Sequence, residues 1–446
     1  MMQNRLNSLL IVIFLLILFT PAKANTYLSK ETKDNIVADK NEASSPTYRI
    51  SLLTCSAGEE IYAYFGHTAI RVENLKTKED YVYNYGQFNM NQPHFIWHFI
   101  LGQTDYQMGK EPFNHFARIY TYINRNVSEQ ILNLKEQEAE KLVENLQKNY
   151  KPQNRNYRYN YFYDNCSTRP YLVIRNSIEG TFLFGEKYTP RSWRDEVNKY
   201  THHASWSNFG MNLLLGAPTD EDMTKTEQLF LPFNLETTFQ SAQIKDQDGS
   251  TRPLVIQQCQ VIQRDETRAI ADRKDSTPFI SAITAAILFF VLTLLITFID
   301  FKRKRITLWF DILLYTVFGL LGLVLIFMGV FSSHPCLTPN YELLLFNPLL
   351  LIVIGSTIRL SKSNNGRRYI SKCLSKEQSS KRSVTDKIVY TLILCCIVLL
   401  ITSFIIQFTF NHVIIQYYPP VSFILALCLL IRLLSAKKCL RSKTRR

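Results

Sequence analysis

The sequence has 446 residues, 46% of them hydrophobic, and a formal net charge of +14. The charge is uneven: residues 278–446 hold 20 of the 51 Lys and Arg residues but 5 of the 37 Asp and Glu residues. In this second part basic stretches separate long apolar runs, which is the pattern of loops beside membrane segments. The basic excess therefore does not indicate a nucleic-acid-binding protein.

Residues 1–24 have the features of a signal peptide. Arg5 supplies a positive start, Leu9 to Phe19 an apolar stretch, and Ala22-Lys-Ala24 a small-residue cleavage pattern. The alternative is a retained N-terminal anchor. Residues 25–46 are polar and predict a loose leader, so the predicted exported domain is 25–277.

The first predicted elements form a hairpin. Tyr48–Cys55 alternates and predicts a strand, and Ile61–Val72 and Tyr81–Phe88 predict two more, separated by a charged turn. Pairing of the last two strands would place His67 on one arm and Asn84 on the other.

Further along, the sequence predicts a strand, a helix and a second strand before the next cysteine. Arg118–Val127 predicts the first strand, and Ser128 is the expected N-cap of a helix that ends near Asn149. Tyr157–Tyr163 is rich in aromatic residues and predicts the second strand. Residues 236–277 predict one or two strands and a charged linker.

Cys166 follows Asn165, a residue typical of helix N-caps, and apolar residues at helical spacing come after it. The N–H groups of a first helical turn are unpaired and partly positive, so they stabilise a thiolate and lower its pKa. A nucleophilic cysteine would be placed at such a position. The alternative is a small buried cysteine at a helix start.

A cysteine nucleophile needs a base and a group that orients the base. His67 follows Phe-Gly in a predicted strand, and Asn84 on the paired strand could hold the imidazole tautomer. Asp164 is the other candidate for the orienting role. A strand histidine that only makes structural hydrogen bonds is the alternative for His67.

Cysteine spacing gives no sign of a metal site or a disulfide framework. The exported part has only Cys55, Cys166 and Cys259, and one bridge such as Cys55–Cys259 stays open. There is no CxxC or CxH pair, so we expect no zinc, and no cofactor is predicted.

Residues 278–446 predict a membrane domain with about five spans and a cytoplasmic C-terminus. Basic stretches follow the first, third and fifth spans, whereas the loops at 332–342 and 409–419 have no Lys or Arg, so 25–277 is expected outside the cytoplasm. Helical spans point to a bacterial inner membrane and a periplasmic domain. The predicted spans are approximately 278–301, 306–331, 343–360, 387–408 and 420–436.

Polar residues in and beside the outer loop are candidates for gating or orienting lipid. They are His334, Asn340 and Asn347, which lie near the predicted membrane boundary. Ordinary roles at helix ends and in interfacial loops are the alternative.

Several motifs together resemble the Lnb family, membrane proteins of Bacteroidota named for lipoprotein N-acylation. Those in the membrane part are less specific than those around the histidine and the cysteine. The stretches that carry the resemblance are Tyr64-Phe-Gly-His-Thr-Ala-Ile-Arg71, Tyr83-Asn-Tyr-Gly86, Tyr163-Asp-Asn-Cys-Ser-Thr168, Trp206 to Pro218, His334 to Asn340 and Phe346-Asn-Pro348.

The resemblance implies an α+β exported domain with a permuted papain-like fold, as in NlpC-type and lecithin retinol acyltransferase proteins. In that fold the histidine strand precedes the cysteine helix, as His67 precedes Cys166 here. It also implies a reaction in which Cys166 takes an acyl chain from a phospholipid as a thioester, with His67 as base. The α-amine of a diacylglyceryl lipoprotein would then receive the chain.

Two other functions stay open. The same pair of residues could serve a periplasmic thiol hydrolase, such as a cell-wall peptidase or amidase. The chain could also be a membrane scaffold without catalytic activity. Several membrane spans favour the acyltransferase, because a soluble wall enzyme rarely needs more than one anchor.

Overall fold

The computed structural model describes most of the exported domain and much of the membrane part. The described ranges are 46–88, 93–185, 187–268, 280–303, 306–355, 390–403 and 420–444, with the single residues 358, 388 and 405. The predicted signal peptide, the leader up to residue 45 and the basic loop after the third predicted span lie outside the described residues.

An antiparallel sheet of seven strands forms the centre of the N-terminal domain. Its strand order is β10-β5-β1-β2-β3-β4-β6, so β2 is the central strand and β1 is its neighbour inside the sheet. The strands are β1 (Tyr48–Cys55), β2 (His67–Asn74), β3 (Asp80–Gln87), β4 (Asp105–Pro112), β5 (Val127–Leu132), β6 (Asn156–Arg158) and β10 (Val255–Ile262).

Helices cover both faces of the sheet, and β1 is buried on both sides as a result. Ile50 and Leu52 point into the larger core, which α4 (Glu136–Tyr150), α5 (Thr168–Ser177) and α8 (Pro232–Ser241) help to close. Leu53 and Cys55 point to the opposite face, where they meet α3 (Phe113–Tyr122). Alternate side chains of one strand thus enter two separate cores.

Smaller elements complete the domain. A three-stranded sheet has the order β7-β8-β9, with β7 at Thr181–Leu183, β8 at Gln243–Lys245 and β9 at Thr251–Pro253. The remaining helical segments of the domain are η1 (Ile61–Ala63), α2 (Phe95–Ile100), α6 (Trp193–Thr201), α7 (Ser205–Leu214), η2 (Ala217–Asp220) and η3 (Glu227–Phe230).

Two helices are long and apolar enough to cross a membrane. They are α10 (Ala282–Arg303) and α11 (Leu308–Phe331), with mean hydropathies of 2.7 and 2.5. Shorter apolar helices at Tyr341–Gly355, Tyr390–Ser403 and Pro420–Ala436 coincide with the other three predicted spans. The first of these includes η4 (Tyr341–Leu344), and the last is the apolar part of α14 (Pro420–Thr444).

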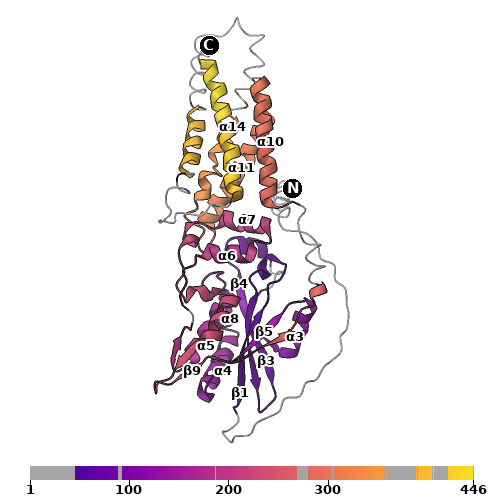
Figure 1. Ribbon diagram of the computed structural model, residues 1–446, viewed down its shortest axis with the longest axis vertical. Coiled ribbons are helices and arrows are strands. Elements are labelled where there is room, and N and C mark those ends of the chain that lie inside the picture. Colours follow the sequence, from indigo (N-terminus) through magenta and orange to yellow (C-terminus); the bar gives the residue numbers. More distant parts are fainter. Residues whose placement is uncertain are drawn as a thin grey trace.

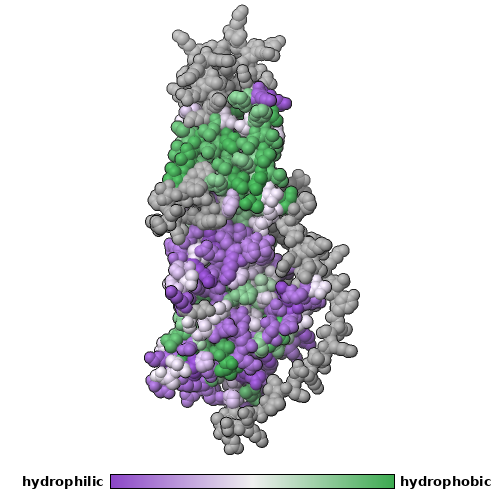
Figure 2. Space-filling model, viewed as in Figure 1, coloured by the Kyte–Doolittle hydropathy of each residue, from purple (hydrophilic) through white to green (hydrophobic). Residues whose placement is uncertain are grey.

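The helical end carries the hydrophobic surface of the molecule. Figure 1 shows α10, α11 and α14 side by side beyond α6 and α7, with the sheet at the other end. In Figure 2 the visible face of these helices forms a hydrophobic band, whereas the visible face of the sheet domain is mostly hydrophilic. This division matches the two-part layout predicted from the sequence.

An ion cluster joins three of the membrane helices. The guanidinium of Arg432 in α14 donates to Asp311 of α11 at 2.6 Å and to Asp300 of α10 at 2.8 Å. All three side chains are buried. A buried cation is tolerated in this apolar region because two carboxylates compensate it.

Two secondary-structure predictions were wrong in the segment after β4. Arg118–Val127 is not a strand, because α3 occupies Phe113–Tyr122 and β5 begins at Val127. Its aromatic residues resemble a strand in composition, but Phe113, Phe116 and Tyr120 recur at helical spacing and pack into one core. Ser128 lies in β5 and caps no helix.

The predicted helix after Ser128 begins later than expected. It starts at Glu136, where the side chain of Glu138 accepts a hydrogen bond from the N–H of Lys135. Leu142 and Leu146 lie on the buried face of α4. Here a local cap, and not the first plausible N-cap residue, decided the start.

The disulfide between Cys55 and Cys259, which the sequence left possible, is not formed. Both cysteines are free, and β5 lies between the strands that carry them. Cys55 is fully buried against Tyr120, and burial raises the pKa of its thiol to about 12.

Candidate active site

The predicted strand before Cys166 is mostly a tight turn. Only Asn156–Arg158 is a strand, and Asn160 and Asp164 then pair through two backbone hydrogen bonds of 3.0 Å. The tyrosines from 157 to 163 therefore do not share one strand face. The chain reverses direction here and places Cys166 directly before α5.

Asn165 caps this turn as the sequence predicts. Its side-chain oxygen accepts hydrogen bonds from the N–H groups of Ser167 at 2.7 Å and Thr168 at 3.0 Å. Regular helix begins only at Thr168, because Pro170 has no N–H to bond the carbonyl of Cys166. Cys166 thus stands at the N-terminal end of α5 instead of within its first turn.

The predicted pairing of β2 and β3 is confirmed, and it joins the two residues expected on its arms. The first of the two strands is shorter at its start than predicted, because Ile61–Ala63 forms a 3-10 turn and β2 begins at His67. His67 opens β2 and Asn84 lies in β3, where both side chains are mostly enclosed. His67 Nε2 and Asn84 Oδ1 are 2.5 Å apart. With Nε2–H as donor to this amide oxygen, Nδ1 is the ring nitrogen that stays available as a base.

Cys166 and His67 meet at Gly86. A Cβ atom added to Gly86 would lie 3.5 Å from Cβ of Cys166 and 3.8 Å from Cε1 of His67. Gly86 has a positive φ of 88°, a conformation that favours glycine. The residue next to His67, Thr68, also donates its backbone N–H to the sulfur of Cys166. The structure thus brings Cys166, His67 and Asn84 into one site.

Burial reverses the predicted pKa of the cysteine. The sequence predicts a lowered pKa at a helix N-terminus, but desolvation raises that of Cys166 to about 11, although the hydrogen bond from Thr68 and the charge of Arg125 act in the opposite direction. Burial also lowers the pKa of His67 to about 4, against the effect of its hydrogen bond to Asn84. At neutral pH both groups are therefore neutral, as thiol and imidazole.

Because Cys166 is a neutral thiol at neutral pH, we expect no titration step of this thiol near neutral pH. The ultraviolet absorbance of thiolate, taken as the difference between wild type and Cys166→Ala, should stay flat from about pH 6 to 9 and rise only toward pH 11. A raised pKa means that the thiol keeps its proton until the pH approaches that value. A difference step below about pH 8 would instead indicate a preformed thiolate and contradict the burial argument.

Two residues near the site have no counterpart among the sequence predictions. The Tyr157 hydroxyl is buried, lies 4.0 Å from the same position at Gly86, and has no hydrogen-bond partner among the described residues. Arg125 bonds the carbonyl of Ser56 at 2.7 Å, and its charge lowers the pKa of both His67 and Cys166. No local pattern points to either residue, because both reach the site only through the fold.

Asp164 has a different partner from the one considered. It accepts two hydrogen bonds from the Arg169 guanidinium, at 2.6 and 2.7 Å. Arg169 also lies over the ring of Tyr157 at 3.5 Å. His67 instead donates to the side-chain oxygen of Asn84, and Asp164 ties the cysteine turn to the start of α5.

The three polar residues of the outer loop region make internal contacts. His334 Nε2 lies 2.7 Å from the carbonyl of Phe99, and Asn340 Nδ2 donates to the carbonyls of Leu213 and Leu214. Asn347 Oδ1 accepts from the N–H of Leu349 at 2.9 Å. The first two join the membrane loop to the N-terminal domain, and the third caps the following turn.

The cysteine turn also reaches this loop. The Tyr163 hydroxyl lies 3.4 Å from Sγ of Cys336, and the N–H of Gly216 bonds the carbonyl of Cys336 at 2.8 Å. The site is therefore held close to the outer end of the membrane helices.

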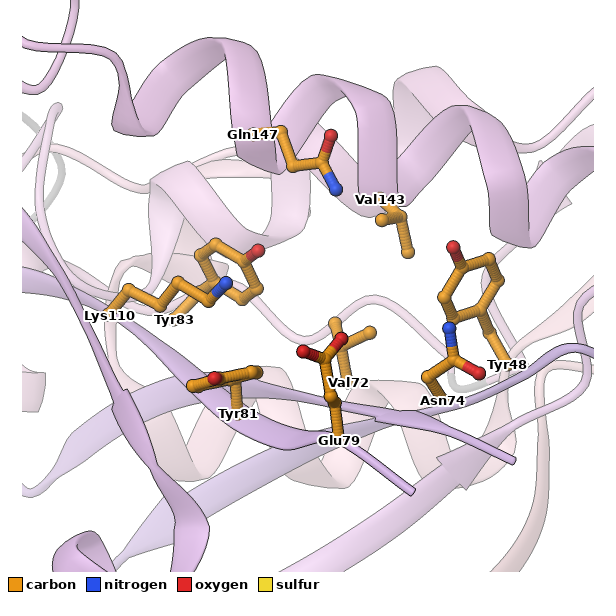
Figure 3. A pocket seen from close by; sticks show the side chains of 9 residues that line it. All are labelled: Tyr48, Val72, Asn74, Glu79, Tyr81, Tyr83, Lys110, Val143 and Gln147. Atoms are coloured by element: carbon orange, nitrogen blue, oxygen red, sulfur yellow. The ribbon is translucent and has the colours of Figure 1, made fainter. Parts of the chain in front are cut away.

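A polar pocket elsewhere in the domain contains none of the predicted site residues. Figure 3 shows it between α4 and strands β1 to β4, with Val143 and Gln147 on the helix side. Its Lys110 lies over the ring of Tyr81 at 3.9 Å. We assign no catalytic role to it, because the cysteine, the histidine and the amide all lie outside its lining.

Fold and site together define a membrane protein whose sheet domain brings a cysteine, a histidine and an amide side chain together. Two family models match the chain: the Lnb N-terminal periplasmic domain at residues 37–196 and the Lnb transmembrane domain at residues 273–375. The matched segments cover more than half of the sequence, and the protein belongs to the Lnb family. It is thus an inner-membrane protein with a periplasmic N-terminal domain.

The other comparisons add no relatives. Neither the curated proteins nor the solved structures contain a match to this chain.

Proposed function

We propose that the protein is an acyltransferase that moves an acyl chain from a phospholipid to the N-terminal amine of a diacylated lipoprotein. The observation that carries the proposal is the site itself: His67 bonded to Asn84 at 2.5 Å, with Cys166 against the same glycine. Membership in a family with a periplasmic and a transmembrane domain supports a role in lipoprotein processing.

In the first half-reaction Cys166 Sγ attacks the ester carbonyl of the phospholipid while His67 Nδ1 takes the thiol proton. Attack coupled to proton transfer suits a pair in which both groups start neutral. The tetrahedral intermediate then expels the alkoxide of the lysophospholipid, which takes the proton from His67. The acyl chain is left as a thioester on Cys166.

In the second half-reaction the unprotonated α-amine of the lipoprotein attacks the thioester carbonyl. His67 accepts the proton that the amine loses, and the C–S bond breaks to release the cysteine sulfur, which recovers that proton. A thioester suits this step because it remains reactive toward amines. Asn84 keeps the proton on Nε2 throughout, so the transferred proton enters and leaves at Nδ1.

The Tyr157 hydroxyl is placed to stabilise the oxyanion of both tetrahedral intermediates. It is a buried donor without a partner among the described residues, on the side of Gly86 where Cys166 lies. Burial raises its pKa, so the hydroxyl keeps its proton and can donate a hydrogen bond. A donor of this kind aimed at developing charge is a usual source of catalysis in acyl transfer.

The proposal includes the finer architecture. The periplasmic domain at 25–277 is a permuted papain-like domain, because the histidine strand β2 precedes the cysteine helix α5 on an antiparallel sheet. Residues 1–24 are a signal peptide, and 278–446 form five spans with a cytoplasmic C-terminus. The contact between the membrane loop and the periplasmic domain is where lipid approaches the site. It is shaped by His334, Asn340 and Asn347, which affect substrate only in this way.

The test is the intact mass of the purified protein after incubation with phospholipid vesicles. Wild type is expected to gain one acyl chain that neutral hydroxylamine removes, and Cys166→Ala is expected to gain none. Tyr157→Phe should form the adduct more slowly by about 10²-fold, the usual effect of one oxyanion donor. A diacylated lipopeptide should then discharge the adduct and gain the same mass.

Other outcomes point to other functions. If no adduct forms with any lipid while peptidoglycan fragments are cleaved in a Cys166-dependent manner, the protein is a thiol hydrolase. If Cys166→Ala fully supports the function of the protein in cells, the scaffold is favoured and the enzyme is contradicted.

A further inference from the structure

Helix α2 is an exposed apolar segment of the periplasmic domain. Ile96, Trp97 and Phe99 are 61%, 52% and 48% exposed, and no residue of the helix is buried. From Tyr81 to Thr104 the sequence has no Asp, Glu, Lys or Arg, although one residue in five of the whole chain is charged. A surface of this kind is unfavourable in water and indicates that something apolar covers it.

The helix is fastened to the outer end of a membrane span. The rings of Trp97 and Phe327 are 5.7 Å apart, and Phe327 lies four residues before the end of α11. At 1.5 Å per residue, this contact is about 6 Å inside the apolar helix end. Ser332 donates its hydroxyl to the carbonyl of Ile100 at 2.8 Å. Tryptophan at this depth is typical of a membrane–water interface.

The loop after α11 makes further hydrogen bonds to the C-terminal end of α2. His334 bonds the carbonyl of Phe99, and its pKa is lowered by burial, so it is the neutral imidazole that donates. The backbone of Ser333 donates to the carbonyl of Leu101 at 2.8 Å. Gly102 has a φ of +65°, and a Cβ there would lie 2.7 Å from the N of His334. α2 is therefore positioned by the membrane domain.

We propose that α2 is inserted into the periplasmic leaflet, with phospholipids covering Ile96, Trp97 and Phe99. The argument is the continuity of this exposed surface with α11. Figure 2 shows that the hydrophobic band of the molecule lies around the spanning helices to which α2 is attached. Because α2 contacts the outer end of α11, the leaflet that covers these helices extends to α2 at the same depth in the membrane.

Aromatic rings form a row from α2 toward the cysteine. Phe95 stacks on Phe88 at 5.8 Å, Phe88 contacts Tyr106 at 5.1 Å, and Tyr106 stacks on Tyr159 at 4.2 Å. Burial and then the charge of Cys166 raise the pKa of both tyrosines, so both are near its sulfur. We infer that an acyl chain follows this row of rings from the leaflet to the site. The route rests on the proposed acyl transfer, whereas the insertion of α2 does not.

The insertion is tested by tryptophan quenching in the full-length protein. The protein is placed in phosphatidylcholine vesicles with brominated or ordinary acyl chains, and the quenched fraction of the emission is compared between variants. Trp97→Phe should lower this fraction, because it removes a tryptophan in contact with lipid. Trp193→Phe is the matched control and should raise the quenched fraction. Trp193 is 4% exposed inside the domain, so its emission is not quenched by lipid, and its removal leaves a larger share of quenched emission. If Trp97→Phe also raised the fraction, α2 would not be in the leaflet.

The route is tested separately through Ile96→Glu. Adduct formation from vesicle phospholipid should slow about tenfold, the effect of one apolar side chain losing its place in lipid, while the rate with a short-chain soluble ester stays unchanged. Ile123→Glu, an equal change at a 42% exposed isoleucine after α3, should alter neither rate. Equal slowing with both esters would contradict the route. Quenching does not depend on catalysis, so loss of the proposed function would leave that result intact.

Discussion

Replacement of His67 by Ala is expected to slow acylation of Cys166 by about 10²- to 10⁴-fold, the usual contribution of a general base. The Cys166 thiol has a pKa of about 11, so few molecules carry a thiolate at neutral pH without help from a base. The measurement is the rate at which intact protein gains the hydroxylamine-sensitive acyl mass in excess phospholipid.

The same assay separates the roles of the neighbouring residues. Asn84→Ala should reduce the rate less than His67→Ala, because it removes the group that orients the imidazole and leaves the base in place. His115→Ala is the control, since His115 of α3 is exposed and bonded to Glu111 near the end of β4. The assignment of the base fails if His67→Ala acylates at the rate of the His115 variant.

The pH dependence follows from the same two groups. The pKa of His67 is about 4, so the imidazole is already unprotonated over the range in which most histidines titrate. The acylation rate should therefore not fall between about pH 7.5 and 5.5, where an ordinary histidine base would be lost.

Replacement of Arg194 by Met is expected to destabilise the periplasmic domain by about 3–5 kcal/mol, the cost of removing one member of a buried ion pair. Arg194 in α6 is 1% exposed and bonds Asp220 twice, at 2.8 and 3.1 Å. It also donates to the carbonyls of Leu215 and Gly216. Thermal unfolding of the full-length protein in detergent should shift down by roughly 10 °C.

Two further variants show whether the lost pairing is the cause. Asp220→Asn added to Arg194→Met should recover part of the stability, because a neutral amide then replaces the buried carboxylate that has lost its arginine. Arg49→Met is the matched control: Arg49 is half exposed in its ion pair with Glu73, and its loss should cost about 0–1 kcal/mol. Strictly additive effects at positions 194 and 220 would contradict the explanation.

The Arg194 cluster also explains how the domain sits on the membrane part. The segment it holds bonds the outer loop directly: the N–H of Gly216 to Cys336, and that of Ala217 to Pro339, both at 2.8 Å. The sequence marks this stretch only through a family resemblance. No local pattern shows that Arg194 would donate to the carbonyls of Leu215 and Gly216, which lie 21 and 22 residues later in the chain.

The parts of the fold that were predicted correctly depend on short-range patterns. Alternation and a charged turn identify the hairpin of β2 and β3, and this pairing by itself places His67 near Asn84. The N-cap chemistry of Asn165 was also correct. The errors came where aromatic composition and helical spacing disagreed, as in α3, because burial of Phe116 and Tyr120 in a core outweighed their strand preference.

By itself the sequence determined the division into a periplasmic and a membrane part, the hairpin and the cap beside Cys166, since each is encoded within a few neighbouring residues. Only the tertiary structure decided that Cys166 lies against Gly86 and His67, that Asn84 and not Asp164 bonds the imidazole, and that the thiol pKa rises. Those outcomes depend on packing between segments far apart in the chain. Packing sets the distances and excludes water, and the loss of water outweighs the helix N-terminus that favours a thiolate.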